Sequence, residues 1–531
     1  MASTSQRGVL KDSIISLPYG KATSKRSKRF HVSRTASSPM AYKTEDTHVG
    51  QGPRRILRTN EEHEGENDAV PPFQWSKHWY PVSVEDCLLK DKPNKVTLLG
   101  RDYVVWEDKG LWNVARDECP HRFAPLSVGR VQDGQLFCRY HGWGFEGGQE
   151  GRCVCNPQAD GPKAEQTTMQ SSRSRLETYP CQVQQGMLWI WPESGADAWL
   201  EAAATPPDTV PEMVDPSFAG SEGSFSWMEN PASNLVMLEN ALDPSHASYV
   251  HNLVISKRED AAPMQMQLSG DIDPQKGFIL EHGGYSKSQQ ENNLKAKRYF
   301  IPPCTIRTHY KYDSGREDMT TLYLVPVAPG VTRAYNKVVV KGVPNLGKKV
   351  FNFLAKNLLS SGYFHAFGHG LVDQDMNVLH SQERKLASKQ RGWRDYYLAT
   401  QSDTGVSAFW RWLNTYAGGD VTYSDGIPAD LPPQMSNEEL LNHYERHTKY
   451  CPACQKAVKR LDQVLVGLLV AGGLAAAAAV LAVPPSVGLE VFGMFLQARI
   501  LLGLVGAGLL YLRRPVQAFR QRFFSAEGII G

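Results

Sequence analysis

The stretch CPHRFAPLSVGRVQDGQLFCRYH, residues 119–141, decides the fold of this 531-residue chain. It places Cys119 and His121 in one short box and Cys138 and His141 in a second, with sixteen residues between the boxes. Thiolate and imidazole groups are the side chains that bind zinc ions and some iron–sulfur clusters. The stretch therefore predicts a metal site held by two loops.

The composition of the boxes distinguishes between two kinds of metal site. Zinc-binding pairs often come as C-x-x-C, whereas here each box combines one Cys with one His. This mixture lets the two thiolates bind one iron, and the two imidazoles the other iron, of a Rieske [2Fe-2S] cluster. Arg122 and the pair Gly142-Trp143 also fit a Rieske box. A structural Cys2His2 zinc site is the alternative.

Short β-forming segments surround both boxes. They are VTLLG (96–100), DYVVWED (102–108), GLWNVA (110–115), GQLFCRYH (134–141) and GMLWIWP (186–192). Short strands at close spacing with Gly turns predict a small antiparallel β domain. We place this domain at residues 73–195, beginning at the aromatic run FQWSKHWYPV.

The overall composition excludes several classes of protein. A chain of 531 residues is too long for one core and predicts two or three domains. A net charge of +3 does not indicate a nucleic-acid binder, and nine scattered cysteines do not form a disulfide scaffold. The cluster also requires a reducing compartment for its assembly.

The N-terminal region has the composition of a targeting segment. Its first forty residues hold nine Ser, eight Lys or Arg and a single acid, Asp12. With no long apolar run, this composition argues against a secretory signal and predicts an organellar transit peptide at 1–45. An ordinary disordered N-terminus is the alternative. Residues 46–72 are polar and acidic and predict a disordered linker.

A second metal motif, ENALDPSHASYVH, occupies residues 239–251. His246 and His251 are five residues apart, and Asp243 lies one helical turn before His246. Two His plus one distant carboxylate form the facial triad of non-haem Fe(II) oxygenases, which leaves positions open for O2 and substrate. Alone the motif is weak, but a Rieske cluster is an electron source for such an iron.

The third ligand is expected in LVDQDMNVLHSQE, residues 371–383, a helical stretch. Asp375 precedes a face containing Val378 and Leu379 that we expect to be buried, and it is the best candidate. Asp373 competes with it on sequence grounds alone. Glu383 is a weaker choice, more consistent with a surface charge.

Two apolar segments near the C-terminus predict a membrane anchor. Residues 464–483 carry no charge over twenty residues, enough to span a bilayer as a helix. Residues 491–512 contain Gln497 and Arg499 and are less uniform. Positive side chains at both outer ends place the catalytic domain and the C-terminus on one side. A buried helical hairpin of a soluble protein is the alternative.

Taken together, the motifs CPH…CRYHGW, ENALDPSHASYVH and DQDMNVLHSQE resemble those of the Rieske non-haem iron oxygenases. WYPV (79–82), the segment 396–414 and Cys451-x-x-Cys454 narrow the resemblance to a plastid group. This group contains pheophorbide a oxygenase, chlorophyllide a oxygenase and the Rieske component of the inner-envelope translocon, and the chain looks most like pheophorbide a oxygenase. The resemblance covers roughly residues 73–520.

The resemblance implies an α+β fold and roles for individual residues. It implies a helix-grip catalytic domain, a curved antiparallel sheet around a helix, at 215–400, followed by an extension at 401–460. By position, the iron ligands are His246, His251 and Asp375. Asp243 bridges a cluster His of one subunit to an iron-binding His of the next, and Asn240 lies close to the iron.

The resemblance also implies partners and a location. These are ferredoxin or a similar one-electron donor, O2, a chlorin-type substrate, a homotrimer, and a chloroplast membrane with the catalytic domain facing the stroma. The phenylalanines Phe351, Phe353, Phe364 and Phe367, together with Tyr363, are candidates for the pocket wall, although core packing suits most of them better.

Cys451 and Cys454 precede the predicted anchor. A lone C-x-x-C is a weak signal for a disulfide or half of a zinc site, and no second Cys pair is available to complete such a site. The plastid relatives motivate the hypothesis of a thiol switch reduced by thioredoxin.

Three functions are consistent with the sequence. The first is ring opening of pheophorbide a in chlorophyll breakdown. The second is oxygenation of another pigment, such as chlorophyllide, protochlorophyllide or a phyllobilin. The third is a non-catalytic Rieske electron carrier or redox sensor at the envelope translocon, against which the second metal motif argues.

Overall fold

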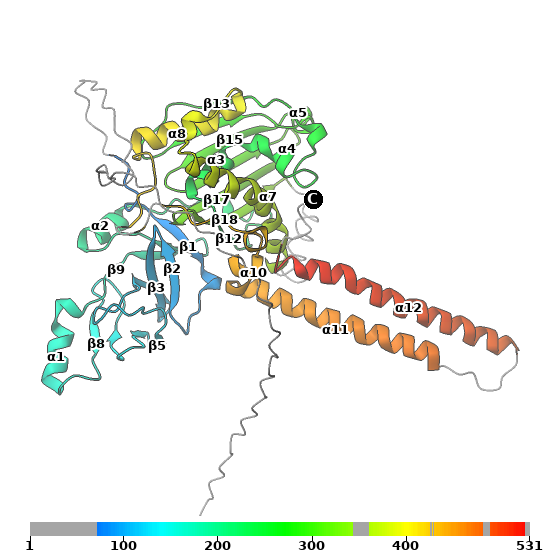
Figure 1. The fold of residues 1–531 in the computed structure, drawn as a ribbon, viewed down its shortest axis with the longest axis horizontal. Coiled ribbons are helices and arrows are strands. Elements are labelled where there is room, and N and C mark those ends of the chain that lie inside the picture. Colours follow the sequence, from blue (N-terminus) through cyan, green and yellow to red (C-terminus); the bar gives the residue numbers. More distant parts are fainter. Residues whose placement is uncertain (1–71, 343–360, 425–426, 428–429, 482–488, 526–531) are drawn as a thin grey trace, which may run out of the picture. The chain divides into compact units, whose positions relative to one another are not determined.

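Figure 1 shows the computed structural model, which describes residues 72–342, 361–424, 427, 430–481 and 489–525. The predicted transit peptide, and the predicted linker up to residue 71, lie outside the described residues. The same holds for Phe351, Phe353 and the Pro484-Pro485 turn, and for the side chains of Phe364 and Phe367.

Three small antiparallel sheets form the N-terminal β region, as predicted. Their strand orders are β1-β11-β10, β2-β3-β4-β9 and β5-β6-β7-β8. The strands are β1 (Tyr80–Val84), β2 (Asn94–Leu98), β3 (Arg101–Asp108), β4 (Leu111–Arg116), β5 (Arg130–Gln132), β6 (Gln135–Phe137), β7 (Gly144–Phe145), β8 (Cys153–Cys155), β9 (Thr178–Tyr179), β10 (Cys181–Gln184) and β11 (Met187–Ile190). Helix α1 (Pro162–Gln170) follows β8, and α2 (Ala196–Ala204) follows β11.

A seven-stranded antiparallel sheet forms the second region, in the order β12-β18-β17-β16-β15-β14-β13. Its strands are β12 (Ser226–Asn230), β13 (Met266–Leu268), β14 (Phe278–His282), β15 (Lys295–Ile301), β16 (Thr305–Lys311), β17 (Glu317–Ala328) and β18 (Val331–Lys341). In β15, KAKRYFI, exposed or half-exposed residues alternate with buried ones, because successive side chains of a strand point to opposite faces. One face of this strand therefore covers a core.

Helices α3 (Asn234–Leu242), α7 (Ser361–Ser388) and α8 (Thr404–Tyr416) pack against this sheet and one another. The apolar side chains of α8 recur at helical spacing, so that Phe409, Trp412 and Leu413 are buried together. Trp412 meets the ring of Phe73 edge-on, with ring centres 5.1 Å apart. Helix α8 lies beyond the predicted domain end at residue 400, yet it packs in the same core.

Several shorter helices lie among the described residues. They are a 3-10 helix (Pro244–His246), α4 (Ala247–Val250), α5 (Lys287–Glu291), α9 (Asn437–Leu440) and α10 (His443–Arg446). A further 3-10 helix, Thr448–Tyr450, leads from α10 to the C-terminal helices. Among them, the 3-10 helix Pro244–His246 and α4 position His246 and His251, and the 3-10 helix Thr448–Tyr450 lies between His447 and Cys451.

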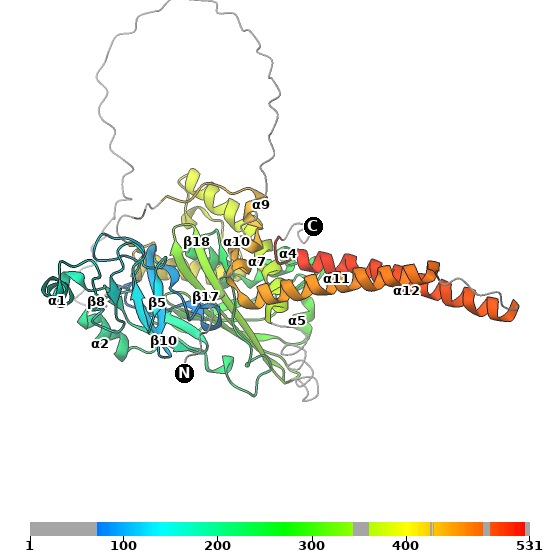
Figure 2. The same ribbon diagram turned by 90° about the horizontal axis from the view of Figure 1, so that it is seen from below.

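Two long helices, α11 (Pro452–Leu481) and α12 (Leu489–Gln521), run side by side in both Figure 1 and Figure 2. Their apolar windows are only 6% buried, so the alternative of a hairpin buried in a soluble core is wrong. With 30 residues, α11 is about 45 Å long, more than the roughly 30 Å of a bilayer core. The helices are therefore suited to a membrane anchor whose first turns lie outside the bilayer.

Small residues allow the two long helices to approach closely. A side chain added at Gly506 of α12 would place its Cβ 3.0 Å from the carbonyl oxygen of Gly472 in α11. The nearby Gly508 has no atom within 4 Å of the same position. The first glycine therefore faces the partner helix and the second does not.

Replacing Gly506 by Ile should separate α11 from α12 and destabilise the hairpin by about 1–3 kcal/mol, because the added atoms have no space. Thermal unfolding of the detergent-solubilised chain, followed by circular dichroism, measures the effect. Gly508→Ile makes the same change on the same helix and should leave the transition unchanged. Equal effects of the two substitutions would contradict the packing described.

Candidate metal centres

The two predicted cluster boxes form a matched pair of loops. In the first, the Phe123 N–H donates to the carbonyl of Cys119 at 2.7 Å; in the second, the Gly142 N–H donates to that of Cys138 at 3.1 Å. Both donor residues have positive φ, 58° and 74°. Each loop thus closes four residues after its Cys, with His121 two residues and His141 three residues after the Cys of its loop.

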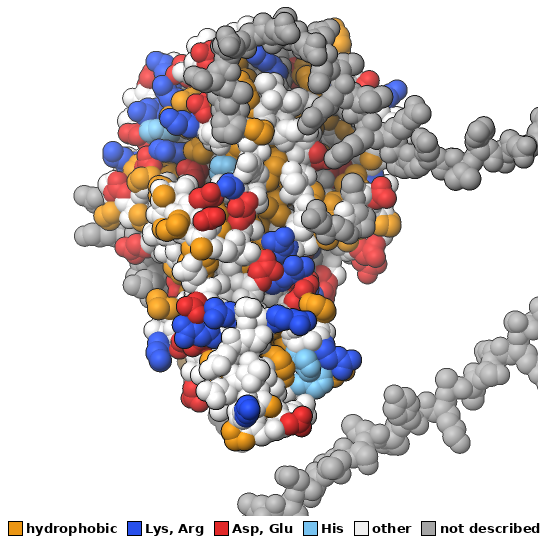
Figure 3. Space-filling model, turned by 90° about the vertical axis from the view of Figure 1, so that its left-hand side faces the viewer, with side chains coloured by type: hydrophobic (Ala, Val, Ile, Leu, Met, Phe, Trp, Pro, Cys, Tyr) orange, Lys and Arg blue, Asp and Glu red, His pale blue; other side chains and the backbone are white. Residues whose placement is uncertain are grey.

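The loop tips bring the two His together at the surface. The rings of His121 and His141 lie 4.7 Å apart, and the His121 ring also stacks on Trp143 at 4.7 Å. The Arg122 guanidinium lies over the Tyr140 ring of the other loop, 5.5 Å from its centre. Figure 3 shows this side of the molecule, with histidine exposed among charged side chains of both signs. An exposed His edge is accessible to an electron donor.

The two cysteines lie beneath the His edge. Cys119 is 2% exposed and Cys138 1%. Burial, together with the adjacent Cys138 thiol, raises the pKa of Cys119 to about 12, so two thiolates need a cation between them. The Tyr140 N–H donates to the Cys138 sulfur at 3.4 Å, as is common around cluster sulfurs. The four side chains therefore fit a Rieske cluster.

The second predicted centre lies where α4 meets α7. His246 ends a 3-10 helix begun by Pro244, and His251 follows the last residue of α4. Their Nε2 atoms lie 3.6 and 3.4 Å from the same oxygen of Asp375. The ligand atoms of this group all lie within 4.8 Å of one another. The structure thus brings together the three residues that sequence analysis selected.

Hydrogen bonds orient both imidazoles of this centre. The Nδ1 of His246 contacts the backbone carbonyl of Asp243, which can only accept, so this nitrogen carries the proton. The Nδ1 of His251 lies 3.0 Å from the Gln374 Oε1 and donates to it in the same way. Both Nε2 atoms are left with a lone pair facing Asp375. This is the tautomer that a metal-binding His requires.

Asp375 completes the group with a negative charge. Burial raises the pKa of its carboxyl, while the imidazoles of His251 and His246 and a hydrogen bond from Asn240 lower it. The carboxylate and the two imidazole lone pairs face one another with no positive charge between them. A divalent iron would supply that charge. The carboxylate of Asp243 is used differently, as it caps its own helix by accepting from the Ser245 N–H at 2.9 Å.

Asp373, the competing candidate, lies on the opposite face of α7. Two residues along an α-helix correspond to a turn of about 200°. Its carboxylate is fully buried, accepts a 2.7 Å bond from Arg446 and contacts His443, both on α10. Asp373 is therefore committed to joining α7 to α10, and only Asp375 faces the two His.

Two smaller expectations are corrected by the structure. Glu383 is not a surface charge: it is 7% exposed and accepts from the Ser233 N–H at 3.1 Å. Val378, expected to be buried, is 49% exposed, whereas Leu379 is buried. The helical pattern alone did not define which stripe of α7 faces α10. Tyr363, a candidate for the pocket wall, stacks on Phe519 of α12.

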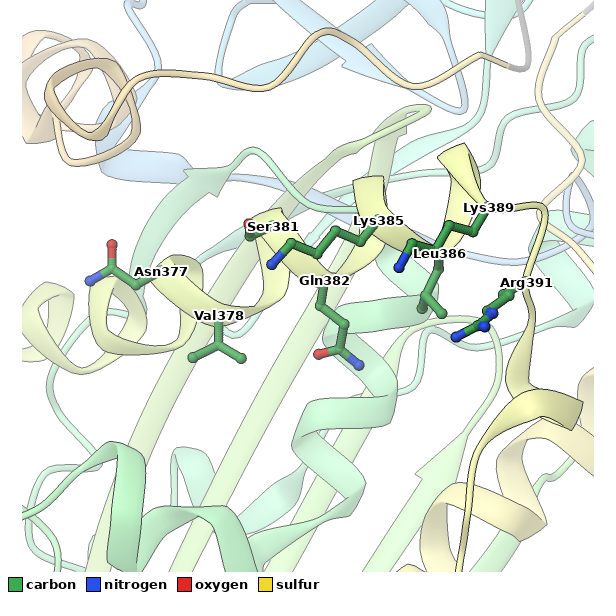
Figure 4. Close-up of a pocket in the computed structure, with 8 residues that line it drawn as sticks. All are labelled: Asn377, Val378, Ser381, Gln382, Lys385, Leu386, Lys389 and Arg391. Atoms are coloured by element: carbon green, nitrogen blue, oxygen red, sulfur yellow. The ribbon is translucent and has the colours of Figure 1, made fainter.

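An open hollow of about 450 Å³ follows the exposed face of α7 (Figure 4). It begins at Asn377 and Val378, two and three residues beyond Asp375, and continues past Gln382 and Leu386. Three basic side chains line its far part: Lys385, Lys389 and Arg391. The hollow thus combines apolar and basic groups on the helix that carries Asp375.

A third group of potential ligands was missed by sequence analysis. Cys451 and Cys454 come together with His365 of α7 and His447, and their ligand atoms all lie within 4.8 Å of one another. The two His are 82 residues apart in sequence, and neither belongs to the C-x-x-C motif. Two His at distant positions form no local sequence pattern, so the sequence alone does not reveal this four-residue group.

Two known protein families match parts of this chain. The Rieske [2Fe-2S] domain family matches residues 78–180, and the pheophorbide a oxygenase family matches residues 300–393. The chloroplastic flavonoid 8-hydroxylase 2 of Ocimum basilicum is 33% identical over 419 residues, covering 75% of this chain and 76% of that protein. The chloroplastic pheophorbide a oxygenase of Oryza sativa subsp. japonica is 31% identical over 438 residues, covering 76% and 78%.

A crystal structure of dicamba monooxygenase bound to dicamba is similar with a TM-score of 0.48 and 19% identity, covering 65% of this chain and 99% of that one.

The fold and the sequence relatives define an oxidoreductase that combines a Rieske cluster with a mononuclear non-haem iron. The chain belongs to the plastid group of Rieske non-haem iron oxygenases that includes pheophorbide a oxygenase and flavonoid 8-hydroxylase. Enzymes of this class use O2 and an electron donor.

Replacing Asp373 by Ala should destabilise the protein by about 3–5 kcal/mol, because it leaves the buried Arg446 without its charge partner. A lower Tm in thermal unfolding measures the loss. Glu438→Ala removes an exposed carboxylate of α9 and serves as the control, with no expected shift. An unchanged Tm for Asp373→Ala would contradict its role in joining α7 to α10.

Proposed function

We propose that this chain is a membrane-anchored oxygenase that adds oxygen to pheophorbide a and opens its ring. The observation that carries the proposal is the convergence of His246, His251 and Asp375 in a chain with a Rieske domain. In this proposal these three residues hold the mononuclear iron. The cluster is held by the four box residues, Cys119, His121, Cys138 and His141.

When bound, the cluster supplies single electrons and the iron supplies open positions for O2 and substrate. The chain's own contribution is orientation. The Asp243 carbonyl and Gln374 hold the two imidazoles through their Nδ1 protons, and Asn240 holds the Asp375 carboxylate. These contacts keep three ligands on one side and leave the other side free.

The hollow along α7 supports an acidic, flat substrate. Pheophorbide a is a planar macrocycle with one free carboxylate, and Lys385 and Lys389 offer positive charges for it. Lys385 follows Asp375 by ten residues, about 15 Å along the helix. A macrocycle lying over Val378 and Leu386 would place its acid near the lysines and its ring toward the iron.

Hydroxylation of a flavonoid is the second candidate, and the 33% identity to flavonoid 8-hydroxylase 2 favours it. Both reactions add oxygen to a carbon of a planar conjugated ring. The flavonoid core has no carboxylate, so the basic end of the hollow would have no partner. This difference separates the two substrates experimentally.

The partners complete the proposal. We assign reduced ferredoxin, or a similar one-electron donor, to the exposed His edge of the Rieske loops. We place the half-buried Asp243 at a subunit junction of a homotrimer, between a cluster His and an iron-binding His. The chloroplastic relatives and the positive charges flanking the hairpin support a chloroplast membrane with the catalytic domain in the stroma.

The deciding experiment offers substrates separately to the full chain in detergent with ferredoxin, its reductase, NADPH and O2. The panel contains pheophorbide a, chlorophyllide a, protochlorophyllide, a phyllobilin and a flavone, with products followed by mass. Oxygen addition to pheophorbide a with loss of its chlorin absorbance supports the proposal. Exclusive turnover of the flavone or of another pigment would overturn it in favour of that substrate.

Asp375→Asn should remove the mononuclear iron and lower turnover more than about 100-fold, since changes to residues that only hydrogen-bond to ligands already cost about 10–100-fold. Iron analysis and the visible spectrum measure this, because the cluster should remain. Asp373→Asn, two residues away on the opposite face, is the matched control. Its amide oxygen can still accept the hydrogen bond of Arg446, which preserves the rotation of α7, so this variant should retain the iron below its lowered Tm. Loss of iron from the Asp373 variant but not from the Asp375 variant would make Asp373 the third iron ligand.

Replacing Lys385 and Lys389 together by Gln should raise KM for pheophorbide a about 5-fold or more, since each exposed ion pair contributes up to about 1 kcal/mol. KM for the methyl ester of the same pigment should not change, because the ester carries no charge. Lys297→Gln removes a lysine paired with Glu281 away from α7 and is the control. Equal KM changes for acid and ester would exclude a charge interaction at this end of the hollow.

A further inference from the structure

We propose that the chain holds a structural zinc ion at the base of the membrane hairpin, bound by four side chains: His365, His447, Cys451 and Cys454. The site is separate from both iron centres and does not depend on the substrate proposed above. It lies where the part of α7 around His365 meets the start of α11.

The distances between the four donor atoms suit one tetrahedral ion. The Nδ1 of His365 lies 3.1 Å from the Nε2 of His447 and 3.4 Å from the Cys454 sulfur. It lies 3.6 Å from the Cys451 sulfur, and the His447 Nε2 lies 3.2 Å from that of Cys454. Ligands at about 2.1 and 2.3 Å from a tetrahedral zinc lie about 3.4–3.8 Å apart. The observed edges agree to within about 0.4 Å.

Hydrogen bonds alone do not account for this arrangement. A ring nitrogen offers one proton or one lone pair in the plane of the ring. The Nδ1 of His365 nevertheless lies within 3.6 Å of three potential metal-ligand atoms: the His447 Nε2 and the sulfurs of Cys451 and Cys454. A single cation among the four atoms uses every lone pair at once. Two Cys and two His are also a usual ligand set of structural zinc.

Burial favours a closed metal site over an exchangeable dithiol. Cys451 is 1% exposed and Cys454 0%, and neither forms a disulfide. Both imidazoles are buried as well, so all four ligands are enclosed by protein. A thioredoxin attacks a sulfur atom that it can reach, and here it would need local opening first. The thiol-switch hypothesis therefore suits this geometry less well than zinc does.

The site would fix the anchor to the catalytic helix. Cys454 lies in the first turn of α11, among apolar residues that include Phe523 near the end of α12. His365 lies ten residues before Asp375 on α7. One ion joining His365 to Cys454 thus restrains the hairpin relative to the helix that carries the candidate iron ligand.

The test uses the full chain, purified in detergent with a reductant. Elemental analysis should find about one zinc per chain, and cobalt exchanged for it should give tetrahedral d–d and thiolate charge-transfer bands. Cys451→Ser with Cys454→Ser, and separately His447→Gln, should lose both signals. The visible spectrum of the Rieske cluster reports in each variant whether the chain has folded.

Two neighbouring residues provide matched controls. Cys87 contacts Cys451 but is not one of the four, and His369 lies one turn after His365 with its Nε2 bonded to the Trp227 carbonyl. Cys87→Ser and His369→Gln should retain the zinc.

The proposal is overturned if wild-type protein contains no zinc and takes up no cobalt, or if the ligand variants keep their zinc. A reversible Cys451–Cys454 disulfide in zinc-free protein would establish the thiol switch instead. If the ligand variants do not fold, removal of zinc from the wild type by a chelator and its return decide. One zinc per chain rebound with the charge-transfer bands of the cobalt form supports the site, and no rebinding overturns it.

Discussion

The buried ion pair between Asp373 and Arg446 is the interaction on which the catalytic region depends. Arg446 donates to the Asp373 carboxylate, to the Asn230 side chain and to the Glu229 carbonyl, and so joins α10, β12 and α7. A buried arginine with these partners fixes the rotation of α7 about its axis. Because Asp375 lies about 200° further round the helix, this rotation directs it toward the two His.

At the two predicted iron centres as well, contacts among protein groups orient the candidate metal ligands. In the Rieske loops, backbone hydrogen bonds and two residues with positive φ set the His positions, so the ligand geometry does not depend on the cluster alone. At the mononuclear centre, the side chain of Asp243 caps the start of the 3-10 helix, and its backbone carbonyl accepts a hydrogen bond from the Nδ1–H of His246. One residue thereby determines both the local helix and the orientation of an imidazole.

Local sequence patterns predicted most of the fold. The strands around the boxes, the helix containing DQD, and the two apolar helices were all expected, because turn residues, alternation and uncharged length are short-range signals. The two long helices extend beyond the predicted apolar spans 464–483 and 491–512: α11 begins earlier and α12 ends later. The charged turns that flank each apolar span are helical too. It also drew α8 into the core, where Trp412 meets Phe73 across more than three hundred residues.

The sequence by itself predicted the chemistry of the two iron centres, because the four candidate cluster ligands and the two candidate iron-binding His come in compact boxes of suitable residue types and spacing. It did not separate Asp375 from Asp373 as the distant third ligand. Only the tertiary structure decided which face of α7 is buried, that Glu383 is buried, and that His365 and His447 meet Cys451 and Cys454. The physical reason is the same in each case. A helix presents several stripes, and the partner that covers one of them is chosen by residues far away in the chain.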